Sequence, residues 1–252
     1  MSETSISLAG RRALVTGAAT GIGAAIAARF ASAGARGVSL DIAAPASLPS
    51  GWRALTADVR SEEALAQACA EATQQLGGEL DLLVAAAGIV PPWRQVIELD
   101  LDEWDDVFAV NVRGIATTLK HAAPRIADGG AIVAIGSLNS WRGDPNLASY
   151  VASKHAVLGI VRSAAIDLGR RGIRVNAVGP GPIATEALRS RIEHRSRTGG
   201  PALDDALAAA AAQTSLGRIA TTDDVAGATL FLASDLAAGI TGQLLPVDGG
   251  LP

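Results

Sequence analysis

The stretch RALVTGAATGIGAAIAARFASAGA, residues 12–35, joins an apolar strand pattern to an alanine-rich helix pattern through a glycine-rich turn. In this turn Gly17, Gly21 and Gly23 allow the backbone to turn tightly, to approach a pyrophosphate closely and to pack the helix against the strand. The N-terminus of the helix then faces the phosphates. Many strand-to-helix turns use glycine for packing alone, so the prediction of a dinucleotide site also depends on the residues that follow.

An acidic residue stands where the next strand ends. Asp41 follows Gly21 by twenty residues, and a carboxylate there can accept hydrogen bonds from both hydroxyls of an adenosine ribose. It would repel a 2′-phosphate, and no arginine or lysine occurs between residues 16 and 28 to attract one. The sequence therefore predicts NAD(H) rather than NADP(H). For Asp58, at the end of the third predicted strand, two roles stay open: a partner for the adenine amino group, or a helix N-cap.

Short apolar runs rich in β-branched residues alternate with longer helical patterns, which is typical of βαβ units and a parallel sheet. We expect one α/β domain over residues 1–252, with Ser61 capping its second helix and Gly77 and Gly78 ending that helix. The segment 184–215 is too long for a simple connection, and is either a lid over a site or a surface helical insertion. The predicted strands are 12–16, 37–41, 52–59, 80–88, 130–137, 172–180 and 242–250, and the predicted helices are 21–35, 62–76, 101–123, 150–171 and 223–234.

The composition excludes several classes of protein. Hydrophobic residues make up 49% of the 252 and charged residues 18%, with a net charge of −4, which argues against disorder and against a nucleic-acid-binding surface. The single cysteine, Cys69, cannot form an internal disulfide, so we expect a reducing, cytoplasmic setting. No apolar run is long enough to span a bilayer, so no membrane association is expected. His121, His155 and His194 share no ligand spacing, and no metal site is predicted.

Tyr150, the only tyrosine of the chain, lies four residues before Lys154 in the stretch SYVASK, residues 149–154. Residues i and i+4 share one face of a helix, so the two side chains point the same way if the helix begins near Ala148. A tyrosine has an ordinary pKa of about 10, and a neighbouring ammonium lowers that pKa. Such a phenol can take a proton from an alcohol or return it to a carbonyl. An isolated pair with this spacing would more often be a buried tyrosine beside a lysine that reaches solvent.

Two more polar residues are candidates for the same site. Ser137 ends the predicted strand 130–137, and the carboxyl ends of parallel strands form the ligand crevice of such a sheet. Asn111 is a polar residue within the apolar pattern of the helix 101–123. It is either a core residue bonded to a backbone carbonyl or the holder of a water beside Lys154.

Taken together, these residues resemble the short-chain dehydrogenase/reductase family in its single-domain form of roughly 250 residues. The resemblance covers essentially the whole chain, and the order and spacing of its motifs are specific. It implies a Rossmann-like, three-layer α/β/α fold with a doubly wound sheet of seven parallel strands, and assembly as a homotetramer. The motifs are TGAATGIG (16–23), NVRG (111–114), Ser137 with YVASK (150–154), VNAVGPGPIAT (175–185) and GITGQLLPVDGG (239–250).

The resemblance also implies a role for each site residue. Tyr150 is the expected general acid/base, and Lys154 is expected to bond the nicotinamide ribose, lower the pKa of the tyrosine and join a proton relay. Ser137 would orient the substrate oxygen, and Asn111 would hold the relay water. The expected cofactor contacts are Gly17, Thr20, Gly21, Ile22, Gly23, Asp41, Asp58, Val59, Ala86, Gly88, Tyr150, Lys154, Pro180, Gly181, Ile183 and Thr185.

One motif departs from the family pattern. After the fourth strand the family commonly has Asn-Asn-Ala-Gly, and this chain has Ala85-Ala86-Ala87-Gly88. The missing asparagine side chains would tie the central sheet to neighbouring backbone. Because backbone groups and Gly88 can still pass the cofactor, we expect NAD binding to survive.

The expected function is an NAD(H)-dependent oxidoreductase that interconverts a secondary alcohol, such as a sugar, sugar acid, polyol or cyclic alcohol, and its ketone. Asn139, Trp141 and Trp93 are the expected substrate-facing residues. The arginines of the segment 184–215 either clamp a substrate carboxylate or are solvated; they are Arg189, Arg191, Arg195 and Arg197. The alternatives are a 3-oxoacyl thioester reductase and a non-catalytic NAD-binding sensor or scaffold.

Overall fold

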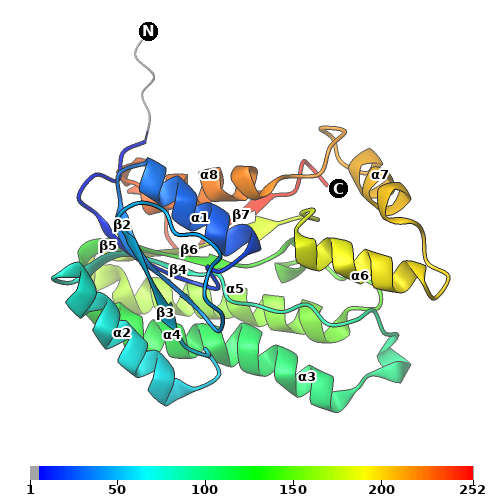
Figure 1. The fold of residues 1–252 in the computed structure, drawn as a ribbon, viewed down its shortest axis with the longest axis horizontal. Helices are drawn as coiled ribbons and strands as arrows, with labels where there is room; N and C mark the ends of the chain where they lie inside the picture. The colour runs from blue at the N-terminus through cyan, green and yellow to red at the C-terminus, as the bar shows by residue number, and fades with distance from the viewer. Residues whose placement is uncertain (1–5, 252) are drawn as a thin grey trace, which may run out of the picture.

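The computed structural model describes residues 6–251, which build one sheet of seven parallel strands (Figure 1). The strand order is β3-β2-β1-β4-β5-β6-β7, so the order reverses between β1 and β4. The prediction of a doubly wound, Rossmann-like sheet is confirmed. The strands are β1 (Arg12–Thr16), β2 (Arg36–Asp41), β3 (Trp52–Thr56), β4 (Leu80–Ala85), β5 (Ile126–Ile135), β6 (Arg174–Pro180) and β7 (Leu244–Val247).

Helices cover both faces of the sheet (Figure 1). On one face α1 (Gly21–Ser32) packs beside α8 (Thr222–Ala233). The other face carries α2 (Glu62–Leu76), α3 (Leu101–Phe108), α4 (Ile115–Ala122) and α5 (Ala148–Leu168). The segment 184–215 forms two further helices, α6 (Glu186–Ser196) and α7 (Leu203–Ala212), that extend beyond the sheet. Among residues 6–251 no helix is both long and apolar enough to cross a membrane.

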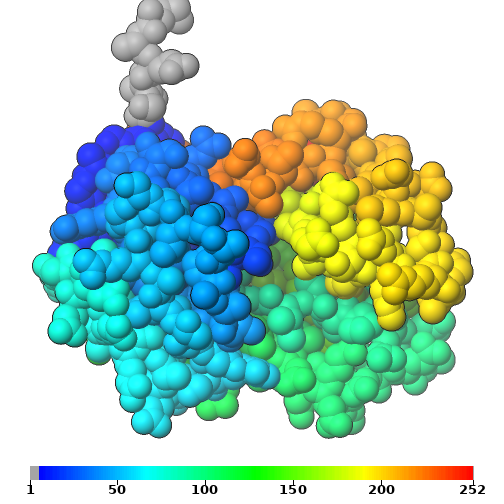
Figure 2. Space-filling model, in the orientation of Figure 1, coloured from blue at the N-terminus to red at the C-terminus, as the bar shows by residue number. Residues whose placement is uncertain are grey.

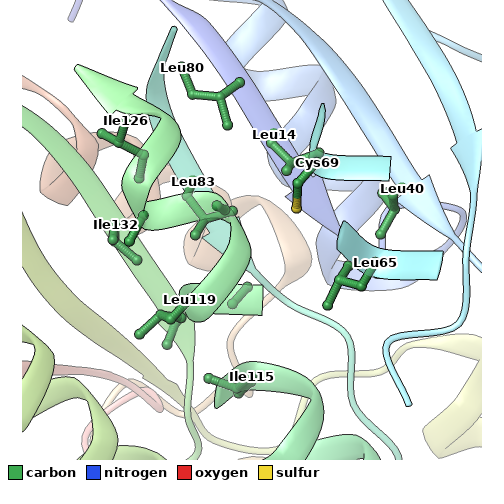
Figure 3. Packing of buried hydrophobic residues seen from close by; sticks show 14 of the residues in the cluster. Leu14, Leu40, Leu65, Cys69, Leu80, Leu83, Ile115, Leu119, Ile126 and Ile132 are labelled. Atoms are coloured by element: carbon green, nitrogen blue, oxygen red, sulfur yellow. The ribbon is translucent and has the colours of Figure 1, made fainter. Parts of the chain in front are cut away.

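Strand residues alternate between two hydrophobic cores, because successive side chains of a strand point to opposite faces. Leu14 and Leu83 lie in the core under α2 and α4, whereas Val15 and Val84 lie in the core under α1 and α8. Figure 3 shows the first core, in which Cys69 is fully buried among leucine and isoleucine side chains. Burial raises the pKa of the Cys69 thiol to about 11, so this cysteine is a packing residue and not a nucleophile.

The predicted signals at the ends of α2 are confirmed. The Ser61 side chain accepts a hydrogen bond from the Ala64 N–H at 3.3 Å, and Gly77 adopts the left-handed conformation (φ 72°) that ends the helix. An acidic pair, Glu62 and Glu63, occupies the first turn, where the positive end of the helix dipole favours it.

One predicted helix is interrupted, and this is the main departure from expectation. The predicted helix 101–123 is α3 and α4 joined by a π-helical turn, Ala109–Gly114, which contains Asn111. No proline stands within the predicted helix, so the apolar periodicity alone favours a continuous helix there. A smaller difference lies at an element end, since β5 begins at Ile126 rather than at residue 130. Helix α5 begins at Ala148, the start on which the shared face of Tyr150 and Lys154 depends.

Candidate active site

The predicted site residues gather at the carboxyl edge of the sheet, where the strand order reverses between β1 and β4. In a doubly wound sheet the crevice at this switch point is the place where ligands bind. Figure 2 shows a depression there, between the blue atoms of the N-terminal part of the chain and the yellow atoms of α6. The β1–α1 turn and the start of α6 approach each other closely, since a Cβ on Gly21 would lie 3.6 Å from Cγ2 of Thr185.

The glycine-rich turn is folded so tightly that two of its glycines leave no room for a side chain. A Cβ on Gly17 would lie 2.6 Å from the Ala87 backbone, and a Cβ on Gly23 would lie 2.0 Å from the Gly17 carbonyl oxygen. Gly21, by contrast, is exposed, with φ +57° and space around it. The first turn of α1 contains no acidic residue, and the side chain of its N-cap, Thr20, makes no capping hydrogen bond. The turn therefore fits the pyrophosphate of a dinucleotide.

Asp41 lies at the end of β2 and holds the tip of this turn. Its Oδ2 accepts a hydrogen bond from the Ala19 N–H at 2.9 Å, and its Oδ1 accepts one from the Ala43 N–H at 3.3 Å. A carboxylate oxygen accepts more than one hydrogen bond, so the position predicted for a ribose partner keeps acceptor capacity.

Asp58 is not a helix N-cap. Ser61 caps α2, and Asp58 instead accepts a hydrogen bond from the Arg60 N–H at 2.9 Å and forms an ion pair with the Arg60 guanidinium at 2.7 Å. The hydrogen bond from the Arg60 side chain lowers the pKa of Asp58. The N-cap interpretation is therefore wrong, and the proposed contact with adenine remains a prediction. Val59, the next residue, is buried and packs against Gly114, where an added Cβ would lie 2.8 Å from Cγ2 of Val59.

The segment with alanines in place of asparagines is tied down by a different side chain. Buried Thr16, the last residue of β1, accepts hydrogen bonds at its Oγ1 from the N–H groups of Ala86 (3.2 Å) and Ala87 (3.4 Å). This holds the end of β4 against the glycine-rich turn without the missing amides, and it leaves Gly88 exposed at the crevice.

Tyr150 and Lys154 lie on one face of α5, as their spacing predicts. The helix begins at Ala148, and Nζ of Lys154 lies 5.6 Å from the centroid of the Tyr150 ring. Lys154 does not reach solvent: only 4% of its surface is exposed, and its ammonium donates a hydrogen bond to the Ile135 carbonyl oxygen at 2.9 Å. Burial lowers the pKa of Lys154 to about 8.

The pKa of Tyr150 is raised in this structure and not lowered, so the expected depression is wrong here. Burial of the phenol is the largest cause, and the charge of Asp144 adds to it. A side-chain hydrogen bond with Ser137 and the positive charge of Arg191 oppose the rise. The Lys154 ammonium, which donates to the Ile135 carbonyl, does not offset this rise.

Ser137 is held in place by a short capped turn. It precedes the 3-10 helix Leu138–Ser140, and its Oγ accepts a hydrogen bond from the Asn139 N–H at 3.1 Å. The Ser137 N–H in turn donates to Oγ of Ser140 at 3.1 Å. This reciprocal pair fixes the direction of a buried hydroxyl that also bonds with Tyr150.

Asn111 is a fully buried clamp on the backbone of the loop that follows β4. Its Oδ1 accepts from the Ile89 N–H at 2.8 Å, and its Nδ2 donates to the Ile89 carbonyl at 2.9 Å and to Oγ of Ser153 at 3.1 Å. The Ser153 hydroxyl in turn donates a hydrogen bond to the Tyr150 backbone carbonyl at 2.7 Å, which links Asn111 to helix α5. Both amide N–H groups are thus in use, so of the two roles left open for Asn111 the structure supports the core residue bonded to backbone.

The segment after β6 reaches the site from the other side. Pro180 ends β6, the Gly181 N–H donates to the Val247 carbonyl at 3.0 Å, and Ile183 is buried. Thr185 caps α6 by accepting from the Leu188 N–H at 3.3 Å. The far end of the segment 184–215 is also anchored, because the N–H groups of Ser215 and Leu216 donate to the carbonyls of Gly250 and Gly249.

The three predicted substrate-facing residues lie in two places around the crevice. Asn139 is buried, and its Nδ2 donates to Asp144 at 3.2 Å. Trp141, 43% exposed, leans over the backbone of Gly179, where a Cβ would lie 3.0 Å from its ring. Trp93 lies under α6, with the guanidinium of Arg191 over its ring at 4.0 Å from the centroid.

The chain is similar over nearly its whole length to known proteins. The model of the enoyl-(acyl carrier protein) reductase family matches residues 17–252. Short-chain dehydrogenase reductase 5 of Arabidopsis thaliana is 40% identical, over 96% of this chain and 95% of that protein. The chain belongs to the short-chain dehydrogenase/reductase family.

Further members of the short-chain dehydrogenase/reductase family share the whole length of the chain. Cis-4-hydroxycyclohexanecarboxylate dehydrogenase of Sinomonas cyclohexanicum is 41% identical over 95% of this chain and 96% of that protein. The solved structure of carveol dehydrogenase from Mycobacterium avium in complex with NAD is similar with a TM-score of 0.86 and 33% identity, over 98% of this chain and 99% of that one. The prediction of an oxidoreductase of the alcohol dehydrogenase kind is confirmed.

The sequence does not single out three side chains on which this short-chain dehydrogenase/reductase site depends. Thr16 and Ser153 hold backbone at its edge, and Asp144 lies close enough to raise the pKa of Tyr150. Ser153 lies three residues after Tyr150 on the same helix, a spacing that brings the two together. Asp144 lies only six residues before Tyr150, but in a loop without a periodic pattern. Thr16 acts across the fold, 70 residues from Ala86, and no local pattern reveals such a contact.

Proposed function

We propose that the protein is an NAD(H)-dependent dehydrogenase that interconverts a cyclic secondary alcohol and its ketone, with Tyr150 as general acid/base. The observation that carries the proposal is the trio at the edge of the sheet: half-buried Tyr150, whose phenol bonds with buried Ser137, and buried Lys154 on the same helix face. Similarity to proteins named for 4-hydroxycyclohexanecarboxylate and carveol supports a ring alcohol among the alcohols expected from the sequence.

Each residue of the trio has a task in this reaction. A bound NAD would supply the acceptor for the hydride that leaves the carbinol carbon. The Ser137 hydroxyl, directed by its capped turn, bonds the substrate oxygen, and Tyr150 takes the hydroxyl proton as the carbonyl forms. An ammonium has three N–H groups, so Lys154 keeps two for a nicotinamide ribose after its bond to Ile135. The cofactor's positive charge is what would bring the pKa of Tyr150 down for this step.

The proposed choice of NAD depends on Asp41 at the end of β2. Its carboxylate would accept hydrogen bonds from ribose hydroxyls and repel a 2′-phosphate. The carveol dehydrogenase structure contains NAD, which supports the same choice. Steady-state kinetics with both cofactors test it. We expect kcat/KM with NAD to be at least about tenfold higher than with NADP, and we expect Asp41→Ala to reduce this ratio. A preference for NADP in the unaltered protein would contradict this role of Asp41.

Tyr150→Phe tests the proposed catalytic role. The variant removes one hydroxyl, and we expect kcat for oxidation of the best ring alcohol to fall by about a hundredfold to ten-thousandfold. NAD binding, measured by calorimetry, should stay within about threefold, because the other expected cofactor contacts remain. Unchanged turnover would show that Tyr150 is not the acid/base, and would favour a non-catalytic NAD-binding sensor if no other substrate reacted.

A second candidate is reduction of the ketone of a 3-oxoacyl thioester. The matching family, described as enoyl-(acyl carrier protein) reductase, favours an acyl thioester as the substrate class. Acetoacetyl thioesters assayed with NADH and NADPH distinguish the two functions. Faster turnover of such a thioester than of any ring alcohol would favour this second candidate.

A further inference from the structure

Arg191, in the middle of α6, is held over the site in a way that its neighbours on the helix are not. Its guanidinium stacks on Trp93, and Nη2 donates to the Pro91 carbonyl at 2.7 Å. Arg195 approaches the same ring less closely, at 5.2 Å. Arg189 instead bonds to the Ala184 carbonyl at the base of its own helix, at 3.3 Å. The stacking and the Pro91 bond together fix the plane of the Arg191 guanidinium.

One donor of this fixed cation has no partner. Nε of Arg191 is buried, and within residues 6–251 no acceptor bonds to it. A buried donor without an acceptor loses its hydration and gains nothing in return, so such atoms are rare in native proteins and call for an explanation. The Nε edge of a guanidinium is also one of the edges that a carboxylate binds with two parallel hydrogen bonds.

The guanidinium of Arg191 lies near the reacting end of the site. It is close enough to Tyr150 for its charge to act on the phenol, and Asp144 acts on both groups. Oδ2 of Asp144 accepts a hydrogen bond from Nδ2 of Asn139 at 3.2 Å, and the hydrogen bond of Arg191 goes to the Pro91 carbonyl and not to Asp144. The desolvated cation and its unused Nε edge therefore remain for a ligand.

We propose that Arg191 binds the carboxylate of the substrate, and that the substrate is a hydroxy acid whose ring holds the carboxylate apart from the alcohol carbon. The inference rests on the proposed function, which places the alcohol at Tyr150. The ring would lie between the phenol and the guanidinium, and the carboxylate would accept hydrogen bonds from Nε and one Nη. In this role Arg191 determines specificity and takes no part in the proton or hydride transfer.

Paired substrates and paired variants test the proposal. Cis-4-hydroxycyclohexanecarboxylate and 4-methylcyclohexanol are oxidised with NAD by the unaltered protein, Arg191→Gln, Arg191→Lys and Arg197→Gln. Arg191→Gln is expected to lower kcat/KM for the acid by about tenfold to a hundredfold, chiefly through KM, and to leave the neutral alcohol within about threefold. Arg191→Lys keeps the charge and loses the paired N–H donors, so its kcat/KM for the acid should lie between those of the unaltered protein and Arg191→Gln. Arg197 is exposed at the end of α6 and serves as the matched control. Arg197→Gln should leave kcat/KM for both substrates unchanged.

The outcomes separate this inference from the function on which it rests. Equal losses on both substrates in Arg191→Gln, or an unaltered protein that oxidises the neutral alcohol as well as the acid, would overturn the role of Arg191 and leave the dehydrogenase intact. If no alcohol is oxidised, the proposed function fails. The carboxylate-binding role of Arg191 is then tested alone, by calorimetric measurement of cyclohexanecarboxylate binding. Binding to the unaltered protein and not to Arg191→Gln supports it; equal binding, or no binding to either, overturns it.

Discussion

Lys154 is buried, with only 4% of its surface exposed, and its ammonium donates a hydrogen bond to the Ile135 carbonyl. The unfolded chain has no such burial, so the lysine there keeps an ordinary pKa near 10.5, against about 8 in the folded protein. Below both values the lysine is protonated in both states and its burial weakens the fold. As the pH rises from about 8 to 10.5, the folded protein releases the proton first and the destabilisation disappears.

Lys154→Met makes this measurable, because the variant has no proton to release. From urea unfolding at a series of pH values, the free energy of unfolding of the unaltered protein, relative to the variant, should increase by about 3 kcal/mol between pH 8 and 10.5. Other titrating groups cancel in the difference. A difference that stays constant over this range would show that Lys154 is not desolvated.

Two glycines of the first turn should respond differently to the same substitution. Gly23→Ala would place a Cβ 2.0 Å from the Gly17 carbonyl oxygen, so we expect a loss of about 3 kcal/mol or more in the free energy of unfolding, together with loss of NAD binding. Gly21→Ala meets no atom closer than 3.6 Å and bears only the strain of a left-handed backbone, about 1 kcal/mol. Thermal melts with and without NAD compare the two variants; equal melting temperatures would contradict the packing argument.

At the scale of elements, the π-helical turn Ala109–Gly114 links the loop after β4 to helix α5 through side-chain hydrogen bonds. Asn111 makes this connection by clamping both backbone groups of Ile89 and bonding Ser153. Both backbone groups of Ile89 would lose their Asn111 partners in an alanine variant. The loop that carries Gly88 therefore depends on a residue of a different element.

Asn111→Ala is expected to reduce the free energy of unfolding by about 2–4 kcal/mol and to speed hydrogen exchange at the Ile89 amide. Ser153→Ala removes one of the Asn111 bonds and leaves the Ile89 clamp, so its loss should be about 1 kcal/mol without faster exchange at Ile89. Denaturant titration and exchange measured by NMR give both quantities. Unaltered exchange at Ile89 in Asn111→Ala would show that the clamp does not order the loop.

The sequence predicts the strands, the cap of α2 and the shared face of Tyr150 and Lys154, because periodicity and capping are local. It does not predict the π-helical turn, since the apolar pattern across residues 101–123 suits an unbroken helix. It also gives the wrong direction for the pKa of Tyr150: the spacing shows that an ammonium is near, but not that the phenol is buried or that the Ile135 carbonyl holds the ammonium. The stacking of Arg191 on Trp93 joins residues 98 positions apart and emerges only from the fold.

At the scale of the whole molecule, the seven-stranded sheet places every catalytic candidate at one edge, and the resemblance to the family implies four such molecules in one assembly. Light scattering after gel filtration should then give a mass of four chains of 25.4 kDa each. The measurement should be repeated at decreasing protein concentration, since mass action dissociates a weak assembly. A mass of one chain at micromolar concentration would contradict the tetramer.

Both ends of the segment 184–215 are fastened to residues 247–250, by Gly181 at one end and by Ser215 and Leu216 at the other. Both anchors follow the segment in the chain, so during synthesis the segment is made before the residues that hold its ends. We expect its two helices to take up their folded position only after residues 247–250 have emerged from the ribosome.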